Sequence, residues 1–198
     1  MHPEILATKL LLRQEINSVT TNILTLNCNG AVIVDSVQHY ARLVQCSPDD
    51  FLGPGARDCS VMYRRGKHII LYNDCVLSTA RKRWSIAHEI GHICCGHTSD
   101  GLKEEQEANA FAGELLIPSV VLRYLLNKKY ISTVNDVADI FKVSLQAAQI
   151  RLDTLSQHCY TSLDKNLLEL YIPIIQKKCT EPVITIPRKC FYTGVAIL

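Results

Sequence analysis

Two consecutive stretches decide the fold of this chain: RKRWSIAHEIGHICCGH at residues 81–97 and EEQEANAFAGELLIP at residues 104–118. Apolar side chains surround nearly the whole helix that the first stretch predicts over 79–95, which is typical of a buried helix. His88 and His92 lie four residues apart, so this helix places both imidazoles on one face, about one turn apart. Two such histidines can share one metal ion, and Glu89 can reach a water held on that ion. The first stretch therefore predicts a metal site with a general base.

The metal site needs a further ligand, because a catalytic zinc ion usually takes three from the protein. The pattern HExxHxxGxxH does not supply it, since Cys95 and Thr98 stand where its glycine and third histidine would be. His97 follows the second histidine by five residues. That spacing predicts a helix-terminal histidine turned away from the metal face, with a role in the site as the weaker alternative. The third ligand is therefore expected from another segment.

The second stretch offers carboxylates on a helix predicted over 103–116, and helical phase selects among them. Glu105 lies on the face that is small and apolar enough to pack closely on the first helix, formed by positions 105, 108, 109, 112 and 116. We therefore predict Glu105 as the third ligand, with Glu107 as the alternative. Asn109, one turn beyond Glu105, is expected to hydrogen-bond either a ligand, from outside the metal sphere, or the helix terminus.

The rest of the chain predicts further helices and one hairpin. Helical patterns cover 3–16, 37–44, 119–128, 133–142 and 144–156, with natural breaks at Pro118 and Pro173. Two short strands over 59–63 and 68–72 flank a turn at Arg65-Gly66. Residues 48–55 are loop by composition, and the weak alternation over 183–198 allows one more strand.

Composition fits an ordinary globular protein of one medium domain, or one domain with a small appendage. Of 198 residues, 47% are hydrophobic and 20% charged, and the formal net charge is +2. This balance gives no argument for a nucleic-acid or membrane partner. Nine cysteines occur without a CxxC pair, and no signal peptide or membrane-length apolar run is recognised. We expect reduced thiols, without a metal knuckle from Cys179 and Cys190, in a cytoplasmic protein.

The two helices predicted over 133–156 resemble a helix-turn-helix, with Ser144 as the cap of the second helix. A DNA-reading helix should carry basic or amide side chains early. This one offers Gln146, Gln149 and Arg151 but no basic cluster. We therefore expect packing or substrate docking from this segment rather than DNA binding.

The two stretches together resemble the ImmA/IrrE family of metallo-endopeptidases, over about residues 60–155. An HELGH-type helix in that family precedes a helix of the type ExEANxFAxxLLMP, and the matching positions here are His88, Glu89, His92, Glu105 and Asn109. The departures are Trp84 and Ile117, where phenylalanine and methionine are usual. The resemblance implies histidine ligands at 88 and 92, a general base at 89 and a third ligand at 105.

The fold so implied is α+β and mostly helical. A zincin-like metallopeptidase core over 1–130, with a short sheet beside the active-site helix, is followed by a helix-turn-helix-like segment with a short tail over 131–198. The implied function is zinc-dependent hydrolysis of a peptide bond in a cytoplasmic protein. The resemblance suggests a transcriptional repressor or an antitoxin-like regulator as the substrate, and a phage or mobile element as the source. Tyr72, at the end of the second hairpin strand, is a candidate oxyanion stabiliser, and a tyrosine of the core or of the site's rim is the favoured alternative.

The alternative function is a regulatory module that binds protein or DNA and carries a structural or sensory metal. Glu89 argues against it, because a structural metal site does not need a general base.

Overall fold

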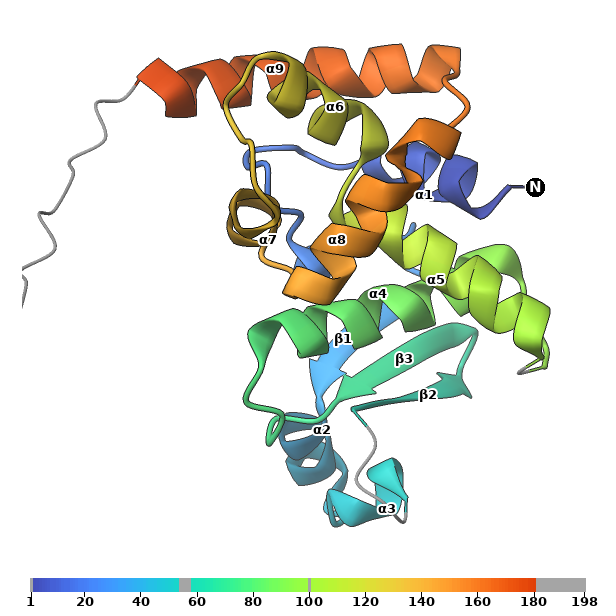
Figure 1. The fold of residues 1–198 in the computed structure, drawn as a ribbon. Coiled ribbons are helices and arrows are strands. Elements are labelled where there is room, and N and C mark those ends of the chain that lie inside the picture. The colour runs from blue at the N-terminus through green and yellow to red at the C-terminus, as the bar shows by residue number, and fades with distance from the viewer. Residues whose placement is uncertain (1, 54–57, 100, 181–198) are drawn as a thin grey trace, which may run out of the picture.

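A computed structural model describes residues 2–53, 58–99 and 101–180, and shows a mostly helical α+β fold with one small sheet (Figure 1). The N-terminal part of the chain contains all three strands of the sheet. Its elements, in chain order, are α1 (Pro3–Leu11), a 3-10 turn (Ile23–Thr25), β1 (Val32–Ser36), α2 (Val37–Val44), α3 (Asp49–Leu52), β2 (Cys59–Arg64) and β3 (Lys67–Tyr72). The helices that follow are α4 (Thr79–Cys95), α5 (Leu102–Leu116), α6 (Ser119–Asn127), α7 (Val134–Phe141), α8 (Leu145–Thr154), a 3-10 turn (Leu155–Gln157) and α9 (Ser162–Thr180).

The sheet has the strand order β1-β3-β2, with β1 parallel and β2 antiparallel to the central strand β3. The predicted hairpin of β2 and β3 is confirmed, and Arg65 and Gly66 both adopt positive φ in its turn, at 52° and 77°. Two successive positive φ values match the right-handed twist of the flanking strands. β1 was not predicted, because its short apolar run lacks the alternation that marks a half-buried strand.

Both faces of the sheet are covered, because alternate residues of β3 enter two separate apolar clusters. Ile70 belongs to the main core, which the helices above the sheet in Figure 1 build, beginning with α4. Ile69 and Leu71 belong to a smaller cluster with Val37 of α2 and Leu52 of α3. The sheet is therefore a middle layer between α4 and the pair α2 and α3 (Figure 1).

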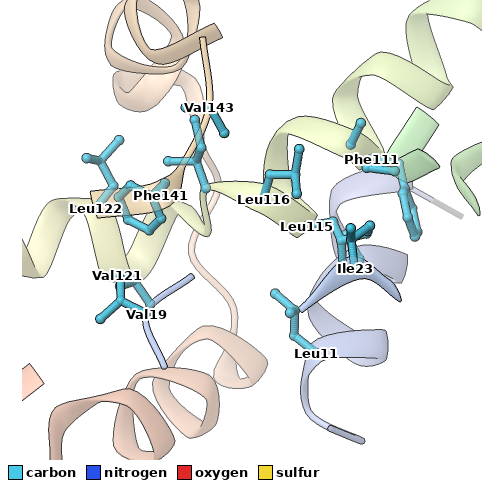
Figure 2. Packing of buried hydrophobic residues seen from close by; sticks show 14 of the residues in the cluster. Leu11, Val19, Ile23, Phe111, Leu115, Leu116, Val121, Leu122, Phe141 and Val143 are labelled. Carbon is cyan, nitrogen blue, oxygen red and sulfur yellow. The ribbon is translucent and has the colours of Figure 1, made fainter. Parts of the chain in front are cut away.

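The main core continues from the first helix to the last. Figure 2 shows Leu11 of α1 beside Ile23 and Leu115, and a second group in which Phe141 and Val143 lie near Leu122. Phe111, Leu115 and Phe141 are each 0% exposed. This cluster crosses the predicted domain boundary at residue 130, so the C-terminal helices pack on the rest of the chain as expected. The boundary itself stays a prediction.

Most predicted helices are confirmed to within two or three residues, and three expectations are wrong. The first helix ends at Leu11 rather than residue 16, because Gln14 turns back to bond the Leu10 carbonyl at 2.8 Å and the Asn27 amide at 2.7 Å. The predicted loop contains α3. There the Ser47 amide donates to Asp50 at 3.0 Å, which satisfies a polar group at the helix start.

Pro173 does not break a helix but lies inside α9. A proline there removes one backbone hydrogen bond. Burial of one face opposes that loss, since Leu167, Tyr171 and Ile175 are at most 1% exposed. The predicted strand over 183–198 and Cys190 lie outside the described residues.

The helices α7 and α8 occupy the two segments predicted over 133–142 and 144–156. The side chain of Thr133 caps α7 in a capping box with Asp136, and Ser144 caps α8 by accepting from the Ala147 amide at 3.1 Å. These caps fix the break between the helices. The likeness of the pair to a helix-turn-helix stays a prediction.

Candidate metal centre

A close crossing of α4 and α5 builds the candidate site. At Gly91 of α4, an added Cβ would lie 3.0 Å from the backbone oxygen of Ala108 and 3.1 Å from its Cα. Ala108 and Ala112 of α5 are 0% exposed. Only glycine on one helix and alanine on the other permit so close an approach. The predicted packing face of α5 therefore lies against α4 at Gly91, three residues after His88 and directly before His92.

The crossing brings three ligand atoms together. Nε2 of His88 lies 3.0 Å from Nε2 of His92, and the two carboxylate oxygens of Glu105 lie 3.3 Å from these nitrogens, one each. All three side chains are partly exposed, at 17%, 15% and 44%. They form one of two groups among the described residues whose ligand atoms all lie within 4.8 Å of one another.

These separations fit a tetrahedral zinc site. Nitrogen and oxygen ligands lie about 2.0–2.2 Å from zinc, so two of them at a tetrahedral angle are about 3.3–3.5 Å apart. The observed 3.0 to 3.3 Å is close to that spacing. Two imidazole nitrogens and a carboxylate, with solvent access on one side, are also the donor set of a catalytic rather than a closed structural zinc site.

Asn109 fixes the direction in which His88 presents its lone pair. Its Oδ1 lies 3.0 Å from Nδ1 of His88. Because that oxygen can only accept, the imidazole proton belongs on Nδ1 and Nε2 keeps the lone pair that faces the cluster. Asn109 therefore lies where the sequence predicted it, against a ligand histidine.

His97 occupies the corresponding position behind His92. Its Nδ1 lies 3.0 Å from Nδ1 of His92, and its Nε2 lies 3.0 Å from a carboxylate oxygen of Glu107. The His97 side chain is only 6% exposed. The hydrogen bond from His97 lowers the pKa of Glu107. His97 therefore orients the His92 imidazole, and Glu107 holds His97 in place.

The contacts of His97 with His92 and Glu107 were not predicted from the sequence. On the metal face of an ideal helix, His97 is a helix-terminal residue and Glu107 the alternative ligand. Gly96 ends α4 with φ 73°, which turns the next residue back toward the helix, and the His97 amide bonds the His92 carbonyl at 3.0 Å. A glycine just before the histidine was the signal for that reversal.

Glu89 is partly buried on α4 and lies close enough to Cys59 of β2 for its charge to act on that thiol. Burial, the charge of Glu89 and that of Asp58 together raise the pKa of Cys59 to about 12. Cys59 therefore stays a neutral thiol beside the Glu89 carboxylate. The seven described cysteine thiols are all free.

Tyr72 lies at the end of β3, where it pairs in register with Ser36 and Cys59. Burial is the largest influence that raises its pKa, and a hydrogen bond with the Ser36 side chain lowers it. These contacts join Tyr72 to the N-terminus of α2. Its role as an oxyanion stabiliser stays a prediction.

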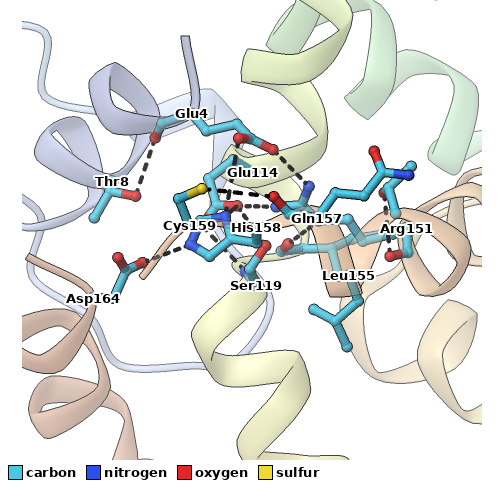
Figure 3. A network of polar contacts seen from close by, with 12 residues as sticks. Glu4, Thr8, Glu114, Ser119, Arg151, Leu155, Gln157, His158, Cys159 and Asp164 are labelled. Atoms are coloured by element: carbon cyan, nitrogen blue, oxygen red, sulfur yellow. Dashed lines mark hydrogen bonds and ion pairs between the residues drawn. The ribbon is translucent and has the colours of Figure 1, made fainter. Parts of the chain in front are cut away.

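A second cluster of carboxylates and histidine lies where α1, α5 and α8 meet (Figure 3). Arg151 binds Glu4 at 3.2 Å and also pairs with Glu114, which is 0% exposed. Glu114 in turn accepts from the amide and hydroxyl of Ser119, at 3.1 and 2.9 Å. His158 lies 3.9 Å from both glutamates and 3.1 Å from Asp164. The positive charge of Arg151 therefore already balances the carboxylate charge of Glu4 and Glu114.

Within the described residues, no single helix has the length and apolar character needed to cross a membrane. One pair, α5 and α6, meets that test by length and composition when taken together, with a bend of 46° between its helices.

The family model of Peptidase_M78, described as an IrrE N-terminal-like domain, matches residues 53–153, just over half of the chain. The matched region holds β2, β3 and all helices from α4 to α8, and so includes every residue of the metal cluster. No curated protein was found to match the chain.

Proposed function

The chain belongs to the Peptidase_M78 family of IrrE N-terminal-like domains, and on that premise we propose that it is a zinc-dependent endopeptidase. The observation that carries the proposal is the convergence of His88, His92 and Glu105, whose ligand atoms lie within 4.8 Å of one another. These three residues would hold the ion, and Glu89 would be the general base. A sensory or structural metal site would leave Glu89 without a purpose.

The chain's own residues divide the chemistry between them. Zinc, when bound, lowers the pKa of a water and polarises the scissile carbonyl. The Glu89 carboxylate takes a proton from the attacking water and later gives it to the leaving amine. Asn109 and His97 keep the two imidazoles oriented by bonding the nitrogens that face away from the cluster, at 3.0 Å each.

We propose a protein substrate in the cytoplasm. A transcriptional repressor or an antitoxin-like regulator is the substrate class that the resemblance to ImmA/IrrE peptidases supports. A DNA-reading role for α8 finds less support, because Gln149 on that helix bonds Asp153 of the same helix at 2.7 Å.

The test compares the wild type with Glu89→Gln, both purified without chelator. We expect about one zinc per chain in each protein, by mass spectrometry, because Glu89 is not among the proposed ligands. Cleavage of an unfolded protein such as casein should fall by about 10²- to 10⁴-fold in the variant, the usual contribution of a general base. A chelator should abolish cleavage by the wild type.

Glu169→Gln serves as the matched control, because Glu169 is an exposed carboxylate on α9. It should cleave at the wild-type rate. Undiminished cleavage by the Glu89→Gln protein would show that another group activates the water, and full activity of protein free of every bound metal would rule out a metallopeptidase.

A further inference from the structure

A cleft of about 810 Å³ opens beside the metal cluster, between the first half of α4, the middle of α5, and α8. Its size is that of a ligand-binding pocket. Asn109 joins the two features, because it lines the cleft and lies 3.0 Å from His88. Whatever occupies the cleft therefore lies next to a proposed zinc ligand.

The floor of the cleft is open at Gly113, one turn beyond Asn109 on α5. An added Cβ at Gly113 would meet no atom within 4 Å. Glycine weakens a helix interior relative to alanine, and neither a positive φ nor a close helix crossing requires it here. Gly91, by contrast, lies against Ala108. The absence of a side chain at Gly113 therefore deepens the cleft, whereas it does not allow any part of the protein to pack closer.

Most of the accessible surface of the cleft is apolar, although polar residues such as Arg81, Ser144 and Gln146 also line it. Ile150 of α8 is 54% exposed, and Trp84 of α4, Ala110 of α5 and Ala147 of α8 line the same cleft. At its far end the charge of Arg151 is balanced by Glu4 and Glu114. An accessible isoleucine and an indole around an open floor suit a branched or aromatic side chain.

We propose that this cleft binds an apolar side chain of the substrate polypeptide, an inference that rests on the proposed peptidase function. Gly113 follows Glu105 by eight residues, so it lies about 12 Å further along the helix axis. An extended peptide advances about 3.3–3.6 Å per residue. For a substrate that runs parallel to α5, the apolar residue thus lies about three or four residues from the scissile bond, and the cleft selects substrates at a distance from the reaction.

Trp84 provides a direct test, because it is the only tryptophan of the chain and lines the cleft. The probes are end-blocked peptides of glycine and serine that carry one leucine, and matched peptides with serine in its place. Titrated into zinc-loaded Glu89→Gln protein, the leucine peptide should change Trp84 emission and bind about 10- to 200-fold more tightly than the serine peptide, the usual range for an apolar side chain in its pocket.

Two variants in the cleft, and one outside it, test whether the peptide binds in the cleft or elsewhere on the surface. Gly113→Leu fills the floor and should weaken leucine-peptide binding at least about tenfold, with an unchanged circular dichroism spectrum and a melting temperature no lower than that of the wild type. Ile150→Ser removes a wall and should also weaken binding. Leu145→Ser is the control, because Leu145 is 56% exposed on the same helix but does not line the cleft, and it should bind as the wild type does.

Equal binding of the two peptides, or wild-type binding by a folded Gly113→Leu protein, overturns the proposal. A dimer that Gly113→Leu converts to a monomer in sedimentation assigns the cleft to a second copy and also overturns it. Binding needs no hydrolysis, so this test is distinct from that of the peptidase function. With active wild type and a peptide library, cleaved sequences should carry a leucine, isoleucine, valine or phenylalanine about three or four residues from the cut, and Gly113→Leu should remove that preference.

Discussion

Two clusters of glutamate and histidine among the described residues each bring three ligand atoms close together, yet they have opposite character. In each, the ligand atoms lie within 4.8 Å of one another. Between Glu4, Glu114 and His158, however, the Arg151 guanidinium pairs with both carboxylates (Figure 3). In the cluster of α4 and α5, the Glu105 carboxylate faces the two imidazoles themselves. Proximity of ligand types alone therefore does not identify a metal site; what matters is whether the protein supplies its own cation.

The two clusters also differ in how deeply their carboxylates are buried. Glu114 is 0% and Arg151 7% exposed, whereas Glu105 is 44% exposed. A fully buried carboxylate needs a resident partner in every state of the protein. A partly exposed one can remain hydrated until an ion arrives. The first cluster is thus expected to stabilise the fold, and the second to bind.

The largest effect should follow from removing the resident cation. Arg151→Met leaves Glu114 buried without its ion pair, and should lower the free energy of unfolding by about 3–5 kcal/mol. Urea denaturation measures the loss. Arg42→Met on the exposed face of α2 is the control, with a change within about 0.5 kcal/mol. A loss below about 1 kcal/mol for Arg151→Met would remove the distinction between the clusters.

Glu105→Gln should have the opposite effect: little change in stability and a large loss of zinc affinity. In chelator-treated protein we expect little change in the free energy of unfolding, because the carboxylate is 44% exposed. Zinc affinity, measured by competition with a fluorescent chelator, should fall by more than the roughly 10- to 100-fold that follows the loss of an outer contact. Glu104→Gln, one residue earlier on the same helix, should keep wild-type affinity. Equal effects of the two variants would leave the third ligand unassigned to Glu105.

His97 should have an intermediate effect through His92. His97→Phe removes the imidazole contacts at 3.0 Å with His92 and Glu107, and should weaken zinc binding about 10- to 100-fold. His97→Gln retains an acceptor and a donor and should restore much of the affinity. The visible spectrum of the cobalt-substituted protein should change in the phenylalanine variant and return toward the wild type in the glutamine variant. Failure of glutamine to rescue either property would mean that His97 acts by packing alone.

The smallest effect concerns the two glycines near the clusters. Gly91→Ala places a methyl group 3.0 Å from the Ala108 carbonyl oxygen. Overpacking costs about 1–3 kcal/mol and the gain in helix propensity returns about 0.5–1 kcal/mol, so a net loss of about 1 kcal/mol and weaker zinc binding are expected. Gly113→Ala should instead stabilise the protein by about 0.5–1 kcal/mol. Thermal melts with and without zinc measure both, and a stabilising Gly91→Ala would refute the close crossing.

The convergence of His88, His92 and Glu105 was predictable because helical phase is a local property. The spacing of His88 and His92, and the small residues on one face of the next helix, predicted that α4 and α5 would pack and which carboxylate would point inward. The role of His97 was missed, since it depends on the chain reversal at Gly96. The chain turns back at this single residue, and a regular helical pattern does not predict such a turn.

The second cluster could not be predicted at all. Arg151 was read as part of a recognition helix, but it lies 3.2 Å from Glu4, which is 147 positions away in the chain. Nothing local in either segment indicates such a pair. β1 and α9 were missed for a related reason: β1 depends on pairing with β3, and α9 continues through Pro173 with its buried face against the core.

The residues matched by the family, 53–153, are not an independent folding unit. The parallel edge strand of the sheet, β1, precedes them. Leu10 and Leu11 of α1 are buried in the same core as Phe111, and Tyr171 of α9 completes it from the other end. A fragment cut at the family boundaries would expose these surfaces to water and is expected to aggregate on expression. A shortened version for crystallisation or engineering should therefore keep residues 2–180.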